Sequence, residues 1–227
     1  MELARAPKEE TPIVTVQKPY QYSITYVPVE TATRGRVYFS FKEIKHLSIA
    51  ALLVAGIGAS WGIYSYTDPL ILTLFAVVFA ASFLAHELAH KFTAQKSGLW
   101  AEFRLTLFGA ALTLLSIVSP LFKIISPGTV MIGGFFERGK VGKISVAGPL
   151  TNIVLSVAFL LAAFLVPVGN IIFLPGFAIN AWIAFFNLIP FGILDGFKVF
   201  SWNKMVWALA FATSLILTIA SYMLLPI

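Results

Sequence analysis

The chain has 227 residues, of which 59% are hydrophobic and only 11% are charged, and its net charge is +6. A water-soluble domain has nearer ~25% charged residues, so this composition excludes a soluble globule and predicts an integral membrane protein. The excess of Lys and Arg is more typical of topology determinants and of contacts with anionic lipid headgroups than of nucleic-acid binding. Because the chain has no cysteine, disulfides, thiolate metal sites and cysteine nucleophiles are excluded as well.

Residues 1–45 form a polar N-terminal tail, which contains four prolines and no apolar core of the kind that a secretory signal has. The remainder, 46–227, is predicted to be a transmembrane domain. At ~20 residues per crossing it accommodates five spans, joined by short turns such as Pro167 to Asn170. The expected spans are about 46–66, 69–97, 145–167, 171–190 and 205–225. The predicted fold class is therefore all-α, a polytopic transmembrane helix bundle.

The segment from Leu105 to Phe122 is uncharged and is long enough to pass as a sixth span. The distribution of basic residues argues against a crossing, because Lys and Arg concentrate in cytoplasmic loops. With five spans all the basic groups that flank them share the cytoplasmic side: Lys42, Lys45, Lys91, Lys96, Arg104, Arg138, Lys140, Lys143, Lys198 and Lys204. We therefore expect a small membrane-associated element that is re-entrant or β-structured, with a strand at Thr129 to Phe136. The N-terminus is then cytoplasmic.

Two histidines flank an acid in the string His86-Glu87-Leu88-Ala89-His90, at the cytoplasmic end of the second span. On a helix, residues i and i+4 share a face, so both imidazoles can bind one ion while Glu87 reaches a water bound to it. Ionisable groups inside apolar segments are costly, and their default interpretation is functional. The sequence thus predicts a zinc site in which Glu87 is catalytic.

A catalytic zinc usually has three protein ligands and one open position, so a third ligand is needed. Asp195 is the only carboxylate after Glu137, and it follows the fourth span at a depth comparable to that of His86. We predict that His86, His90 and Asp195 bind one Zn²⁺ ion. The alternative is that Asp195 caps a helix or pairs with Lys198.

The segment from Asn187 to Gly196, together with the HExxH string, resembles the site-2 protease family of intramembrane zinc metalloproteases. It reads as the family's NxxPxxxxDG element, and Ala147 to Asn152 is similar to a further family segment, AGPxxN. The three matches lie in the expected order over about 110 residues. The resemblance implies the same three zinc ligands and Glu87 as the group that activates water. It also implies that Asn187 and Asn152 hydrogen-bond the substrate backbone or the oxyanion. An interhelical hydrogen bond is the alternative for each asparagine.

The expected function is hydrolysis of peptide bonds in or near the transmembrane segments of single-span substrate proteins, with the active site towards the cytoplasm. A substrate helix must unwind before attack, and an extended peptide could pair with a strand edge. Gly133 and Gly134, in the predicted strand, are the candidate substrate-binding positions. Two alternatives stay open, a polytopic metal-ion transporter that uses the same His/Asp site and a non-catalytic scaffold that binds zinc for stability.

Overall fold

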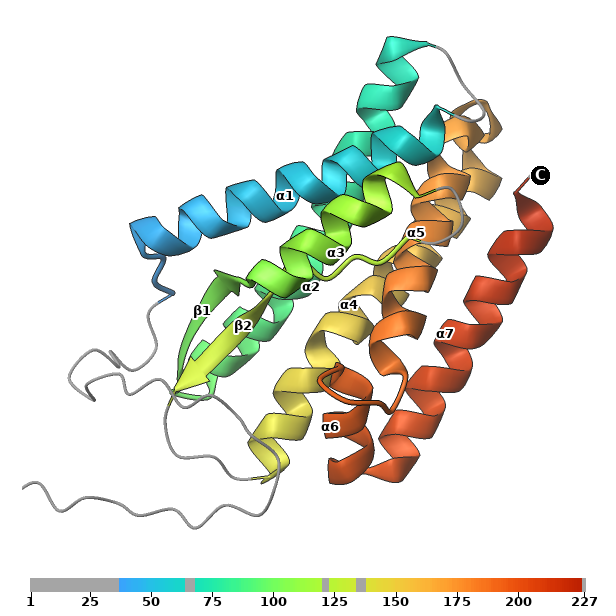
Figure 1. Ribbon diagram of the computed structural model, residues 1–227. Helices are drawn as coiled ribbons and strands as arrows, with labels where there is room; N and C mark the ends of the chain where they lie inside the picture. Colours follow the sequence, from blue (N-terminus) through green and yellow to red (C-terminus); the bar gives the residue numbers. More distant parts are fainter. Residues whose placement is uncertain (1–36, 64–67, 120–122, 134–137, 226–227) are drawn as a thin grey trace, which may run out of the picture.

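The computed structural model describes residues 37–63, 68–119, 123–133 and 138–225. Within these ranges, five helices are long and apolar enough to cross a membrane. They run alternately up and down the bundle (Figure 1) and are α1 (Phe41–Gly62), α2 (Pro69–Lys96), α4 (Arg138–Leu165), α5 (Asn170–Leu188) and α7 (Lys204–Leu224). The polytopic all-α fold predicted from composition is therefore confirmed, and the protein is a multi-pass membrane protein.

α1 begins at Phe41, five residues before the span expected from an uncharged window. Ser40 caps the helix, because its side chain accepts a hydrogen bond from the backbone N–H of Glu43 at 3.1 Å. Lys42 and Lys45 are exposed, while Glu43 is fully buried. A search for a window without charged residues misses this first turn of α1. The turn does carry charges, but Lys42 and Lys45 face out of the bundle and Glu43 is paired inside it.

A two-stranded antiparallel sheet lies at one end of the bundle, which we call the hairpin end (Figure 1). β1 (Trp100–Leu105) pairs with β2 (Gly128–Gly133), from Trp100 opposite Gly133 to Leu105 opposite Gly128. The expected strand at 129–136 corresponds to β2, and its last positions, 134–136, lie outside the described residues. β1 was not expected, although its buried Ala101 and Phe103 alternate with polar neighbours.

The chain between the two strands forms α3 (Leu107–Val118), which Thr106 caps by accepting a hydrogen bond from Gly109 N–H. Because β1 and β2 pair directly, the chain leaves the sheet, follows α1 as a short helix and comes back to the same end. The return is close, since a Cβ atom at Gly109 would lie 2.2 Å from the Ser126 carbonyl oxygen. The segment from Leu105 to Phe122 was expected to be re-entrant from the positions of the charges, and that description fits this element. Residues 120–122 lie outside the described ranges.

Small residues let the long helices approach each other. A Cβ atom at Gly58 on α1 would lie 2.8 Å from the Phe75 carbonyl oxygen on α2, and one at Gly176 on α5 would lie 2.6 Å from the Phe159 ring on α4. In a membrane, helix association depends on such close packing, because lipid is as apolar as the side chains. The turn expected at 167–170 is a single 3-10 turn, η2 (Pro167–Gly169).

A further short helix, α6 (Asp195–Trp202), was not expected; it follows α5 in the chain and lies at the hairpin end between α4 and α7 (Figure 1). It packs against α4 at Gly142, where a Cβ atom would lie 2.1 Å from the Trp202 indole. The amphipathic segment is too short and too polar to be recognised as a span, and packing against α4 fixes it.

Candidate metal centre

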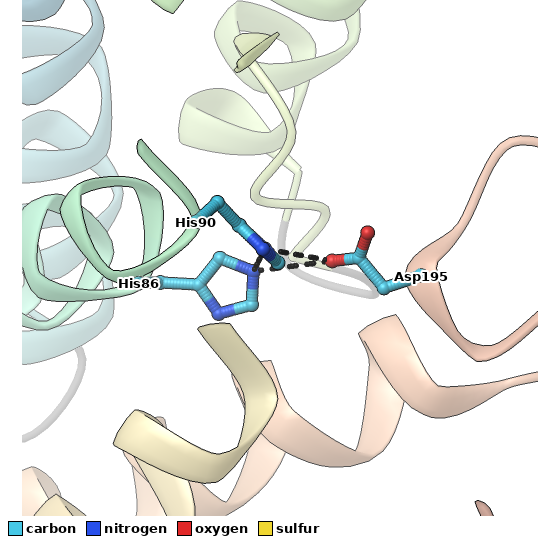
Figure 2. A group of neighbouring side chains, drawn as sticks. All are labelled: His86, His90 and Asp195. Carbon is cyan, nitrogen blue, oxygen red and sulfur yellow. Dashed lines mark hydrogen bonds and ion pairs between the residues drawn. The ribbon is translucent and has the colours of Figure 1, made fainter. Parts of the chain in front are cut away.

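His86 and His90 project from the same face of α2 into the bundle, and both side chains are buried. Their Nε2 atoms face each other at 3.0 Å (Figure 2). This follows from the helical repeat, which stacks residues four apart. The pair lies in the second half of a 28-residue helix, so it sits within the hairpin-end half of the bundle.

Asp195 reaches these histidines from α6. Its Oδ2 atom lies 2.9 Å from His90 Nε2 and 3.5 Å from His86 Nε2 (Figure 2). One ligand atom from each of the three residues lies within 4.8 Å of the others. The three predicted ligands thus come together although Asp195 is more than one hundred residues away from the histidines in sequence.

Two glycines allow the chain to bring Asp195 to this position. After α5 ends at Leu188, the chain turns at Gly192, whose φ of +59° lies in the left-handed region that favours glycine. A Cβ atom at Gly196 would lie 2.1 Å from the Leu188 carbonyl oxygen. Because glycine has no side chain, α6 can begin in contact with the end of α5. Asp195 is the first residue of α6, so this contact fixes its position.

The hydrogen bonds of the imidazoles leave their Nε2 atoms free to bind an ion. His90 Nδ1 lies 2.7 Å from the Ile144 carbonyl oxygen, and His86 Nδ1 lies 2.5 Å from Asn152 Oδ1. Both oxygens can only accept, so each Nδ1 carries a hydrogen, and on a neutral imidazole Nε2 then presents a lone pair. Two lone pairs and a carboxylate oxygen that face one another match the nitrogen and oxygen donors that zinc binds. The donor set fits a zinc ion.

The backbone of α4 borders the two imidazoles at Gly148. A Cβ atom there would lie 2.2 Å from His90 Nε2 and 2.7 Å from His86 Nε2. Any side chain at this position would therefore occupy the point at which the ligand atoms converge. The glycine of the AGPxxN segment has a steric role here.

The charges around Asp195 keep it ionised. Burial alone would raise the pKa of Asp195, but the contacts with the two imidazoles and with Lys198 outweigh it and hold that pKa well below its usual range. Lys198 Nζ donates to Asp195 Oδ1 at 3.2 Å, which leaves Oδ2 towards the histidines. Glu87 is buried beside His86 on α2, within electrostatic range of Asp195 and Lys198. A second carboxylate thus stands next to the three potential ligands.

The structure distributes the remaining predicted site residues differently. Asn152 is fully buried and makes the interhelical hydrogen bonds of the alternative interpretation, to His86 and, through Nδ2, to the Ser82 carbonyl oxygen at 3.2 Å. Asn187 donates to the Ile183 carbonyl oxygen of its own helix at 2.9 Å. Their substrate contacts stay predictions. Gly133 lies at the end of β2, and Gly134 is outside the described residues.

Sequence reasoning missed several polar residues around the site. Asn180 and Ser82 are buried within apolar helices and are hydrogen-bonded to each other and to Asn152. Lys91, the residue after His90, forms a buried ion pair with Glu43 at 2.5 Å. The signal that could have found them is their cost, because polar groups among apolar residues in a membrane helix must find partners there.

The described residues form a five-span bundle in which two buried imidazoles and a half-buried carboxylate meet at one point, so the chain is a multi-pass membrane protein with a group of side chains that could bind a metal ion. A protein of Methanocaldococcus jannaschii named "Putative zinc metalloprotease" is 33% identical over 175 residues, which cover 75% of this chain and 90% of that protein. The chain belongs to the same zinc metalloprotease family. No family model and no solved structure matches the chain.

Proposed function

We propose that this protein is an intramembrane zinc endopeptidase of the site-2 protease type. The observation that carries the proposal is the convergence of His86, His90 and Asp195 inside a bundle of apolar helices, with the buried Glu87 carboxylate within electrostatic range of His86 and Asp195. Three ligands with an adjacent carboxylate are typical of a catalytic site, whereas a structural zinc site is closed by four protein ligands. The depth of the site in the bundle favours substrates that are themselves membrane-embedded.

When bound, a zinc ion supplies Lewis-acid chemistry, which polarises a carbonyl and makes water nucleophilic near neutral pH. In this scheme Glu87 is the general base, which takes the proton of the attacking water as the new C–O bond forms. Glu87 then gives that proton to the amide nitrogen as the C–N bond breaks, so the base becomes the acid. His86, His90 and Asp195 would hold the ion, while Lys198 donates a hydrogen bond to the second oxygen of Asp195.

Substrate in an extended conformation would add to the sheet, and one of its two edges is already occupied. Along β1, the outward carbonyl of Ala101 accepts from Lys91 Nζ and Gln95 Nε2, each at 3.3 Å. The outward N–H of Phe103 donates to Glu43 Oε1 at 2.9 Å, and that of Leu105 donates to His46 Nδ1 at 3.2 Å. Side chains of α1 and α2 therefore close the β1 edge, which favours the β2 edge for a substrate strand.

The register selects the residues of β2 that could pair with substrate. In an antiparallel pair the residues alternate between those that bond the partner strand and those whose backbone faces away. Since Ala101, Phe103 and Leu105 face α1 and α2, their opposite residues Ile132, Val130 and Gly128 face the other edge of the sheet. We call this the free edge, because no strand among the described residues pairs with it. Gly133 stands opposite Trp100 in the other class, so its backbone bonds β1. We infer that Val130 and Ile132, more than Gly133, bind the substrate backbone.

The variant Glu87→Gln tests the catalytic role directly. We expect purified Glu87→Gln in detergent to retain one zinc per chain and to lose cleavage of a single-span substrate that the wild type cleaves. A chelator should abolish wild-type cleavage, and added zinc should restore it. Retained cleavage in Glu87→Gln would contradict the mechanism, and zinc flux in vesicles without proteolysis by the wild type would support the transporter instead.

The substrate edge has its own test. Val130→Pro removes an N–H that faces the free edge, where proline is tolerated in a strand, while Val130→Ala trims the same side chain and keeps the N–H. We expect Val130→Pro to lose cleavage of a helical substrate at least tenfold more than Val130→Ala, with zinc content unchanged in both. Equal losses would show that only the packing of the side chain matters.

We also propose that the hairpin end, and with it the active site, faces the cytoplasm, because most of the described Lys and Arg residues lie there. Lys123 is the exception, since its Nζ donates to Ser60 Oγ near the other end of α1. The chain has no cysteine, so single cysteines can report the topology. Lys204→Cys at the hairpin end of α7 and Tyr222→Cys near its other end are both exposed positions. In intact cells an impermeant maleimide should label only the second variant, and the reverse pattern would contradict the orientation.

A further inference from the structure

Three polar side chains form a cluster behind the metal centre, one on each of three long helices. They are Ser82 on α2, Asn152 on α4 and Asn180 on α5, with 2%, 0% and 0% of their surface exposed. Their neighbours along each helix are mostly apolar, so each polar group was costly to bury. Of the three side chains, only that of Asn152 bonds a potential metal ligand, which is His86.

Every N–H of the two amides has an acceptor. Asn180 Nδ2 donates to the Gly176 carbonyl oxygen at 2.9 Å and to Ser82 Oγ at 2.8 Å. Asn152 Nδ2 donates to Asn180 Oδ1 at 2.7 Å and to the Ser82 carbonyl oxygen at 3.2 Å. Ser82 Oγ in turn donates to the Val78 carbonyl oxygen at 2.8 Å.

Three of these hydrogen bonds end on backbone carbonyls, which can only accept. The direction of the whole network is therefore fixed, and with it the orientation of both amides. Asn180 turns its Oδ1 towards Asn152, and Asn152 consequently turns its own Oδ1 towards His86. If the Asn152 amide were reversed, an N–H would face His86 Nδ1, and the hydrogen of a neutral imidazole would move to Nε2, where the ion binds.

We propose that Asn180 is a positioning residue of the zinc site, which acts on His86 through Asn152. It contributes no ligand and touches no ligand. It holds the amide that keeps His86 in the tautomer and ring orientation that zinc requires. Partners of this kind typically change metal affinity 10- to 100-fold when they are removed. This inference depends on the proposed function only in that zinc is the ion.

A plain interhelical contact would predict a different behaviour, and the chain offers a matched comparison. Ser156 on α4 is also fully buried, and its hydroxyl donates to the Phe177 carbonyl oxygen on α5 at 3.0 Å. This hydrogen bond joins the same two helices as the one between Asn152 and Asn180, but it does not lead to His86. Ser156→Ala therefore removes comparable helix packing and leaves the network to the histidine intact.

The test measures the zinc dissociation constant of the full chain in detergent, by competition with a chelator, and the unfolding temperature of the zinc-free protein. We expect Asn180→Leu to weaken zinc binding about tenfold and Ser156→Ala to leave it within twofold of wild type. Asn180→Ser serves as a second, smaller replacement should the leucine prevent folding.

A double-mutant cycle with Asn152→Ala separates action through Asn152 from general destabilisation. If Asn180 acts through Asn152, Asn180→Leu should weaken zinc binding no further once Asn152 is alanine. Full additivity of the two losses, or an equal loss in Ser156→Ala, would overturn the inference. A wild-type protein that binds no zinc would instead refute the proposed function, so the two failures are distinguishable.

Discussion

Gly148→Ala is the sharpest test of the geometry of the metal centre. Helix propensity alone predicts that this change stabilises α4 by about 1 kcal/mol, since alanine is the better helix former. The site predicts the opposite for zinc. The new Cβ atom would lie 2.2 Å from His90 Nε2, whereas real Cβ atoms essentially never approach another atom within 3.0 Å.

The magnitude follows from that contact. To relieve it, His90 or α4 must move by at least about 0.8 Å, the difference between the 3.0 Å limit and the 2.2 Å contact. Zinc–ligand distances are satisfied only within about 0.2 Å of their ideal values. The displacement exceeds this tolerance several times over, so we expect a loss in zinc affinity on the order of 100-fold or more.

The assay is chelator competition on the purified protein, with Gly139→Ala as the control on the same helix. A Cβ atom at Gly139 would meet only Trp202 Nε1, at an ordinary contact distance of 3.9 Å. This variant should bind zinc like the wild type. If Gly148→Ala bound zinc within a few-fold of wild type, the claim that α4 borders the convergence point of His86 and His90 would be refuted.

Three further predictions concern the surroundings of the site. Gly196→Ala should weaken zinc binding at least tenfold, because its Cβ atom would lie 2.1 Å from the Leu188 carbonyl oxygen and push Asp195 away. Competition with a chelator measures the zinc affinity, and an unchanged affinity would contradict this prediction. Ser40→Ala should lower the free energy of unfolding by about 1 kcal/mol through loss of the helix cap, with zinc affinity unchanged in the same assay. Removal of zinc should lower the free energy of unfolding by about 2.7 kcal/mol, compared with protein in free zinc at 100 times the zinc dissociation constant. Unfolding with and without a chelator measures this difference, and an unchanged transition would mean that zinc does not bind the folded state.

Much of the helical architecture could be predicted from the sequence, because hydropathy and the positions of Lys and Arg report on the bilayer directly. The second span illustrates this, since the expected 69–97 differs from the observed α2 (Pro69–Lys96) by one residue. The charges also separated the re-entrant segment from a sixth crossing. The start of α1 could not be predicted in the same way, because Glu43 is buried only through its partner Lys91, 48 residues further along the chain.

The candidate site divides in a similar way. The HExxH string and the helical repeat suffice to place His86 and His90 on one face, and elimination suffices to name Asp195. β1, α6 and the polar cluster of Ser82, Asn152 and Asn180 were beyond local reasoning, because each exists only through contacts between distant segments. A short amphipathic stretch such as Asp195–Trp202 has no signal of its own until α4 and α5 pack against it.

The sequence by itself thus determined that this is a membrane protein of five spans that carries two histidines and an acid at helical spacing, because composition and periodicity are local properties of the chain. The tertiary structure alone decided which groups meet. It closed the β1 edge, brought Asp195 Oδ2 to within 2.9 Å of His90 Nε2 and directed Asn152 at His86. Interactions across helices depend on how closely backbones approach, and here that approach depends on glycines such as Gly148 and Gly196, whose importance only the packed bundle reveals.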